Sequence, residues 1–238
     1  YVKEHYGTLD VAMAVERVPG EKMYIDWVGD QPEIICNRET GEMCKAHVFV
    51  TTIGISSKIY AEIFPDEKQS SFVKGTVHAV EAYGAVAKYF VPDNCRTAVT
   101  KHTKDELIIN SSYQDLEKFY DVVILPPPAR KPTGKPTVER YVQYLETELL
   151  EKMKEKIYSS FEEANQEVKE IVAAINNEVP NGWNITHQEA FENYDRPRMK
   201  SLSDGSFSLC EYVAFSAVPR NYHLLYDGHY YSVFYTYY

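Results

Sequence analysis

Three acidic residues, Asp26, Asp93 and Glu139, stand where strands or helices are expected to begin or end. Asp26 lies inside a largely apolar run, where a carboxylate is costly to bury unless it is paired or binds a metal ion. Asp93 directly follows Pro92, which removes a backbone donor and favours the end of a strand. Glu139 opens a long helix after Pro136. Three carboxylates that converge at one sheet edge make an oxygen-rich site for two divalent cations, Mg²⁺ or Mn²⁺, which suits phosphoryl transfer.

Each of these acids also has a purely structural interpretation. Asp93 and Asn94 together could cap a helix, and Glu139 could sit in a first helical turn, where the helix dipole favours negative charge. Asp26 is harder to explain in this way, because it interrupts an apolar strand.

Length and composition predict a globular protein. The chain has 238 residues, 44% of them hydrophobic, which is enough for one full domain and part of a second. It contains no run of about 18 apolar residues and no charged-then-apolar leader, so we expect neither a membrane span nor a signal peptide, and a cytoplasmic location. Because it starts at Tyr1 and ends within an aromatic run, we expect it to be cut from something longer.

The cysteines are scattered and show no Cys-x-x-Cys spacing, which argues against a zinc site and against a disulfide framework. We therefore predict free thiols at all four positions. They are Cys36, Cys44, Cys95 and Cys210.

The net charge of −10 is unusual for a protein that contacts phosphates. The charge is unevenly distributed, because residues 141–195 hold twelve acidic residues and four lysines, whereas a basic cluster surrounds Glu139. A solvated basic loop would have the same composition as this cluster. We nevertheless predict contacts with DNA phosphates for Asn94, Arg96, Lys101, Lys104, Arg130, Lys131, Lys135 and Arg140.

Hydrophobic periodicity predicts an alternation of strands and helices. The expected strands are 22–28, 33–37, 43–52, 86–91 and 121–125, and the expected helices are 68–84, one ending at 115–120, one from Glu139, 160–177 and a short one at 187–193. In the Glu139 helix we assign Val138, Val142, Leu145, Leu149 and Met153 to the core and Glu139, Gln143 and Glu146 to a polar stripe.

This order of elements, with three antiparallel strands first, is that of the α/β ribonuclease H-like fold, a mixed five-stranded sheet with flanking helices. The chain resembles the catalytic core of IstA-type transposases of the IS twenty-one family, which are retroviral integrase-like enzymes. The resembling pieces are Pro19-Gly20-Glu21, Ile25-Asp26-Trp27, Pro92-Asp93-Asn94, Lys135 to Arg140, Glu189 to Glu192, Asp195-Arg196-Pro197, Tyr222-His223 and Asp227 to Val233.

The resemblance implies a DDE transposase in which Asp26, Asp93 and Glu139 match the three metal-binding carboxylates. It implies cleavage at the 3′ end of an insertion sequence followed by strand transfer, with two Mg²⁺ (or Mn²⁺) ions. The implied partners are transposon-end and target DNA, further copies of the chain on that DNA, and an AAA+ ATPase helper. The implied location is the bacterial cytoplasm, at the nucleoid during DNA integration and recombination.

We expect four segments: an N-terminal linker over 1–18, a catalytic domain over 19–160, a helical and loop extension over 161–205, and the start of a small β-barrel-like domain over 206–238. Two other hypotheses remain at this point. One is a ribonuclease H-like nuclease without strand transfer, and the other is a non-catalytic module in which the acidic helical segment docks a partner protein.

Overall fold

The structure is a computed structural model, and it describes residues 18–29, 32–37, 40–92, 99–102, 107–109, 111–125, 147–153, 156–202, 205, 207–210, 215, 217–234 and 236. The strands are β1 (Lys22–Trp27), β2 (Glu33–Asn37), β3 (Glu42–Lys45), β4 (His47–Ile53), β5 (Ile59–Phe64), β6 (Ala85–Val86), β7 (Tyr89–Pro92), β8 (Val99–His102), β9 (Leu107–Ile109), β10 (Val123–Ile124), β11 (Lys200–Ser201), β12 (His223–Tyr226) and β13 (His229–Ser232). The helices are α2 (Gln69–Tyr83), α3 (Ser111–Tyr120), α5 (Phe161–Asn176), α6 (His187–Ala190), the π-helix η1 (Phe191–Asp195) and the 3-10 helix η2 (Arg196–Arg198), and residues 147–153 are also helical.

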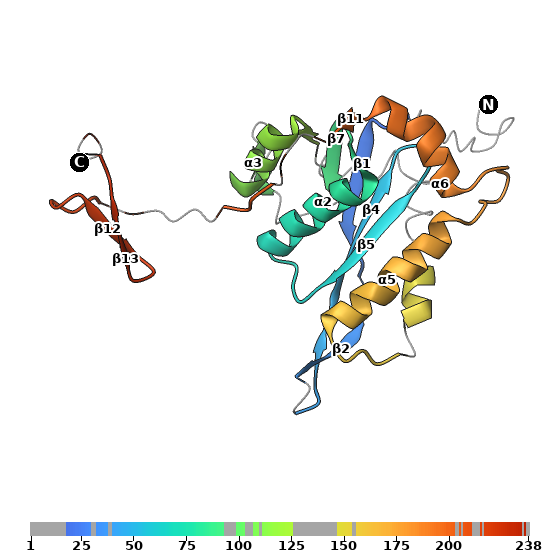
Figure 1. Ribbon diagram of the computed structural model, residues 1–238, viewed down its shortest axis with the longest axis horizontal. Coiled ribbons are helices and arrows are strands. Elements are labelled where there is room, and N and C mark those ends of the chain that lie inside the picture. Colours follow the sequence, from blue (N-terminus) through green and yellow to red (C-terminus); the bar gives the residue numbers. More distant parts are fainter. Residues whose placement is uncertain are drawn as a thin grey trace, which may run out of the picture.

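The central sheet has five strands in the order β10-β7-β1-β4-β5. β1 is parallel to β7 and antiparallel to β4, β7 is parallel to β10, and β4 is antiparallel to β5. Figure 1 shows α2 and α5 lying along different parts of this sheet, with β1 inside it. The predicted α/β class and mixed five-stranded sheet are confirmed.

Alternation along the strands divides the core between the two faces of the sheet. On one face, Met23, Ile25 and Phe49 pack in a cluster with residues of α2 and α3. On the other face, Val48 and Val50 belong to a second cluster with α5 and the helical residues 147–153. In that helix Leu149 and Met153 are buried, as predicted, whereas Val138, Val142 and Leu145 lie outside the described residues.

The prediction that the first three expected strands form one antiparallel sheet is wrong in one respect. Residues 33–37 do not enter the central sheet but pair with β3 in a separate two-stranded ribbon. On the antiparallel side of β1 the next strand is β4, and the edge strand beyond it is β5, which was not predicted from the sequence. β5 presents Tyr60 and Glu62 to the α2 side while Ile59, Ala61 and Ile63 are buried on the other, so its polar residues weaken the apolar signal.

The two long helices confirm the periodicity argument and have local reasons for their ends. α2 stops at Gly84, whose φ of 65° is left-handed and whose N–H donates to the carbonyls of Val80 and Glu81. Ser160 is the N-cap of α5, and its side chain accepts from the backbone N–H of Glu163.

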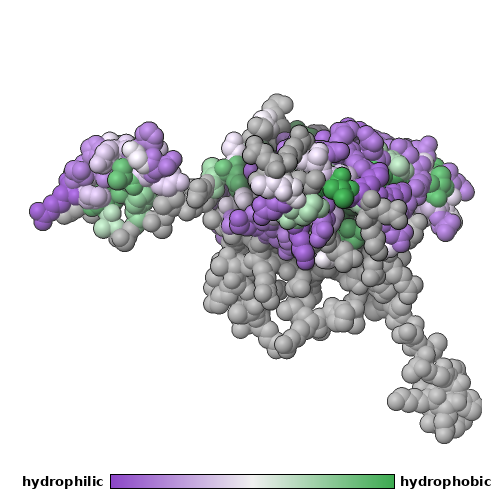
Figure 2. Space-filling model, turned by 90° about the horizontal axis from the view of Figure 1, so that it is seen from below, coloured by the Kyte–Doolittle hydropathy of each residue, from purple (hydrophilic) through white to green (hydrophobic). Residues whose placement is uncertain are grey.

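The C-terminal part described here ends in the β12–β13 hairpin. Asp227 and Gly228 form its two-residue turn with φ values of 46° and 75°, as the Asp-Gly signal predicts. The hairpin exposes large apolar side chains, among them Leu225 and Tyr230, and Figure 2 shows apolar residues grouped on its surface at the left. Within the described parts of the chain, no helix has the length and apolar character needed to cross a bilayer.

The prediction of four free thiols is wrong, because Cys44 takes part in a disulfide. Cys210 is a free, exposed thiol. Cys44 lies in β3, opposite Ile34 of β2. Spacing along the chain does not reveal which residues approach across an antiparallel ribbon, so the scatter of the cysteines was a poor guide there.

Candidate active site

Asp26 lies near the carboxyl end of β1 and is half-buried. Its Oδ1 accepts a hydrogen bond of 2.8 Å from the backbone N–H of Trp27. In the antiparallel pairing with β4, Asp26 is opposite Val50, so its side chain lies on the opposite face of the sheet from Met23 and Ile25. The strand therefore buries its apolar residues on one side and holds a carboxylate at its end on the other.

The pairing of β1 with β7 bears directly on the second predicted acid. The parallel register runs from Lys22 opposite Tyr89 to Ile25 opposite Pro92. Asp26 is the residue after Ile25, and Asp93 is the residue after Pro92. Asp93 itself lies outside the described residues, so its side chain remains a prediction.

The other predicted site residues are not placed. Glu139 lies outside the described residues, and Lys101 belongs to β8, of which only the backbone is described. The remaining predicted DNA contacts also lie outside the described residues. They are Asn94, Arg96, Lys104, Arg130, Lys131, Lys135 and Arg140. Among the residues that the structure does describe, no three acidic, histidine or cysteine side chains cluster as metal ligands.

Trp27 packs behind Asp26, on the other face of the sheet. Its ring lies edge-on to Phe49 at a centroid distance of 5.4 Å and to Phe64 at 5.9 Å, and tilted against Phe72 at 6.3 Å. Trp27 is therefore a packing residue. The aromatic cluster fixes the backbone on which the carboxylate of Asp26 stands.

The structure also identifies a buried carboxylate to which the sequence analysis gave no role. Asp195 is fully buried. Its Oδ1 accepts from the N–H of Gly20 at 2.6 Å and its Oδ2 from the N–H of Ser56 at 2.8 Å. A third, longer bond of 3.2 Å comes from the N–H of Ile55. Asp195 thus ties the π-helix η1 to the start of β1 and to the β4–β5 turn.

A second contact holds the same turn. His187 Nδ1 lies 2.6 Å from the carbonyl oxygen of Ser56 and donates to it. Burial lowers the pKa of His187, although the bond to Ser56 opposes this shift. These contacts lie at the end of β1 remote from Asp26, and they connect η1 and α6 to the frame of the sheet. The signal in the sequence was the Asp195-Arg196-Pro197 piece, whose partners are 139 to 175 residues away in the chain.

Comparison with known proteins finds relatives over almost the whole chain. The chain is similar to the transposase y4uI of Sinorhizobium fredii, with 28% identity over 98% of this chain and 45% of the relative. It is also similar to a transposase of insertion sequence IS1162 from Pseudomonas fluorescens, with 30% identity over 97% of this chain and 41% of the relative. The transposase of IS21 from Pseudomonas aeruginosa is 24% identical over 67% of this chain and 39% of its own length.

The chain therefore spans less than half the length of these curated relatives. No family model matches it. The resemblance to insertion-sequence transposases, including that of IS21, is confirmed by these relatives.

A solved structure shares the fold. A chain of the simian T-cell lymphotropic virus intasome, determined by electron cryomicroscopy in complex with the PP2A regulatory subunit B56 gamma, superposes with a TM-score of 0.54. The match covers 80% of this chain and 61% of that one at 14% identity. At this identity the likeness concerns the fold alone, and together with the strand order it confirms the ribonuclease H-like core.

Proposed function

Because the chain is homologous over nearly its whole length to insertion-sequence transposases, we propose that it is the catalytic core of a DNA transposase. In this proposal Asp26, Asp93 and Glu139 hold divalent metal for cleavage at the transposon end and for strand transfer into target DNA. The observation that supports it best is the parallel register of β1 and β7, which ends one residue before Asp26 and one before Asp93.

The register argument is geometric. Residues opposite each other in a parallel pair have their side chains on the same face of the sheet. If the pairing of Ile25 with Pro92 is extended by one step, Asp26 and Asp93 become neighbours on one face, at the carboxyl ends of two adjacent strands. Two carboxylates so close repel each other unless cations lie between them, and hard cations such as Mg²⁺ favour oxygen ligands.

The donor set fits such ions. Asp26 keeps its orientation through the 2.8 Å bond from the Trp27 N–H, which holds Oδ1 close to the backbone at the end of β1. Two bound Mg²⁺ or Mn²⁺ ions would supply Lewis-acid stabilisation of both the attacking and the leaving oxygen of an in-line displacement. The residues of the chain then position the phosphodiester and neutralise it, and no covalent protein intermediate is needed.

The proposal extends to partners. The phosphates of transposon-end and target DNA would be held by the basic residues around Glu139 and by those that follow Asp93. We further propose assembly of several copies on DNA and cooperation with an ATPase helper of the AAA+ class.

Substituting Asp26→Asn in the full-length protein tests the catalytic role. Asparagine preserves the size of the side chain and its acceptor for Trp27, but it removes a charge from the metal site. We expect loss of both end cleavage and strand transfer of labelled DNA in Mg²⁺ or Mn²⁺, with an unchanged or higher melting temperature because like-charge repulsion is relieved.

Asp121→Asn is the matched control, since Asp121 is an exposed carboxylate that pairs with Lys200. It should retain both activities. Retention of activity by Asp26→Asn would contradict the proposal, and a marked fall in its melting temperature would indicate a structural acid instead. Cleavage without strand transfer by the unsubstituted protein would indicate a nuclease.

A further inference from the structure

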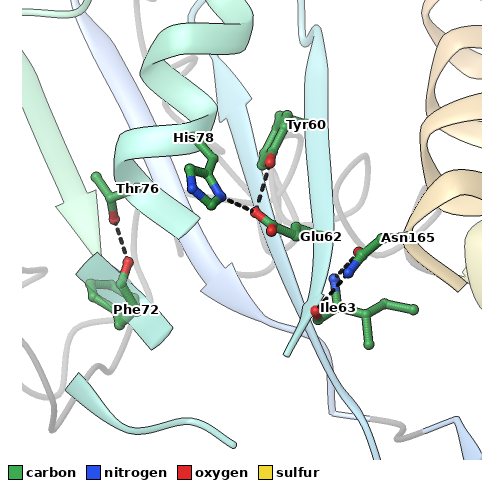
Figure 3. A network of polar contacts seen from close by, with 7 residues as sticks. All are labelled: Tyr60, Glu62, Ile63, Phe72, Thr76, His78 and Asn165. Atoms are coloured by element: carbon green, nitrogen blue, oxygen red, sulfur yellow. Dashed lines mark hydrogen bonds and ion pairs between the residues drawn. The ribbon is translucent and has the colours of Figure 1, made fainter. Parts of the chain in front are cut away.

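Two asparagines of α5 form hydrogen bonds with the backbone of β5, the edge strand next to β4. Asn165 Oδ1 accepts from the N–H of Ile63 at 2.7 Å, and its Nδ2 donates to the carbonyl of the same residue at 3.0 Å. Asn176 makes the same pair of bonds with Ile59, both of 2.9 Å. Figure 3 shows Asn165 facing the backbone of Ile63. Each carboxamide thus replaces one residue of a missing neighbour strand.

Ala61 lies midway between these two clamped residues. Alternate residues of a strand direct their backbone N–H and C=O to the same side. Since the carbonyl of Lys58 points toward β4, where it accepts from Ile53, the backbone groups of Ile59, Ala61 and Ile63 point away from β4. The outward N–H and C=O of Ala61 therefore form a third position of the kind that Asn165 and Asn176 occupy.

A cavity opens at this third position. It has a volume of about 340 Å³ and lies between β5, the end of α2, the second half of α5 and Gln188 of α6. Ala61 lines it together with Tyr83, Val172 and two lysines, Lys58 and Lys169. Its size falls within the range of small-molecule sites, and its lining combines apolar walls with a few polar groups.

Two lysines contribute positive charge to the lining of the cavity. Lys58 is more than half-buried, and its Nζ lies 4.1 Å from the ring centroid of Phe191. Burial lowers the pKa of Lys58, against the opposing effect of Glu192, so a bound anion would stabilise the ammonium form. Lys169 is exposed on α5 at the same cavity.

We propose that this cavity binds a small carboxamide that also carries a carboxylate. The carboxamide oxygen accepts from the N–H of Ala61 and its NH₂ donates to the carbonyl of Ala61, as the two asparagines do at Ile59 and Ile63. The carboxylate is held by Lys58 and Lys169. The site is at the outer edge of the sheet, separate from Asp26, and its test does not depend on the proposed transposase activity.

Titration of the isotope-labelled chain with succinamate, followed by backbone amide NMR, tests the proposal. We expect a saturable shift of the Ala61 amide with half-saturation at about 1 mM, an affinity reasonable for a ligand of this size. Succinate has a carboxylate in place of the amide, which can accept from the N–H of Ala61 but cannot donate to its carbonyl. It should bind at least about tenfold more weakly, because that hydrogen bond is lost and the two oxygens repel each other. Equal binding of the two compounds would overturn the proposal, because the cavity would then be only an anion site.

Two variants test the two halves of the site. Ala61→Pro removes the donor, and an edge strand tolerates proline where the N–H faces outward. It should abolish succinamate binding while the spectrum of the rest of the domain is retained. Lys169→Met should weaken binding about threefold, because an ion pair with an exposed lysine contributes about 1 kcal/mol or less. It should leave the Ala61 amide signal of the unliganded chain unchanged. Unchanged affinity in Lys169→Met, or in a folded Ala61→Pro variant, would refute the assignment.

Discussion

Removing the buried carboxylate of Asp195 should destabilise the fold strongly. Asp195→Ala leaves the N–H groups of Gly20, Ile55 and Ser56 without their acceptor. A buried donor left unpaired costs about 1–3 kcal/mol. Two of the three bonds are short, at 2.6 and 2.8 Å, and one is long, at 3.2 Å, so we expect a total loss of about 3–5 kcal/mol.

Asp195→Asn should cost less, because an amide keeps one acceptor oxygen. If that oxygen occupies the place of Oδ1, the bonds from Gly20 and Ile55 persist and only that from Ser56 is lost. We expect a loss of about 1–3 kcal/mol for this variant. The order of stability, wild type above Asn above Ala, follows from the number of donors that remain paired.

Urea unfolding followed by circular dichroism measures these differences. Glu192→Gln is the matched control, because Glu192 is a partly exposed carboxylate in the same short helix and accepts from side chains, those of Arg196 and Gln188, one helical turn away on either side. We expect the control to change the free energy of unfolding by less than about 0.5 kcal/mol. A loss below about 1 kcal/mol for Asp195→Ala would show that the three N–H groups do not depend on the Asp195 carboxylate, because even one buried donor left unpaired costs at least about 1 kcal/mol.

Two further predictions concern α2. The hydrogen bond to Glu62 raises the pKa of His78, against the effect of partial burial, and Figure 3 shows the pair. The stabilisation of the fold by protonated His78 should therefore be full below about pH 6.5 and lost as the pH rises through the pKa of His78 in the folded state. The melting temperatures of wild type and His78→Ala should therefore differ more at about pH 5.5 than at about pH 8, and the opposite trend would contradict the assignment. Gly75→Ala should lower the melting temperature despite the better helix propensity of alanine, because its Cβ would lie 2.8 Å from the buried ring of Phe49 and overpacking costs about 1–3 kcal/mol. A higher melting temperature would show that the ring can move aside.

Local patterns predicted much of this fold. Regular apolar spacing located α2 and α5 to within one residue at each end, and an Asp-Gly dipeptide, a strong local turn signal, lies at the turn of the last hairpin. These features depend on residues close together in the sequence, so a local pattern contains the information that determines them.

What the sequence analysis missed depends on distant partners. β5 went unrecognised because Tyr60 and Glu62 interrupt its apolar residues, and it becomes a strand by pairing with β4. The structural role of Asp195 went unrecognised because a buried acid has no periodic signature. Its hydrogen-bond partners are the backbone N–H groups of Gly20 and Ser56, which are distant in the sequence. Asp26 was found because an acid inside an apolar strand is locally conspicuous.

In the proposed active site, Asp26 and Asp93 share divalent metal with Glu139 at the carboxyl ends of β1 and β7. This can be tested with a crystal structure of the full-length protein grown with Mn²⁺, in which anomalous scattering locates the ion. We expect Mn²⁺ bonded to carboxylate oxygens of both Asp26 and Asp93 at about 2.2 Å, near the distances usual for oxygen ligands. Carboxylates of Asp26 and Asp93 on opposite faces of the sheet, with no ion between them, would contradict it.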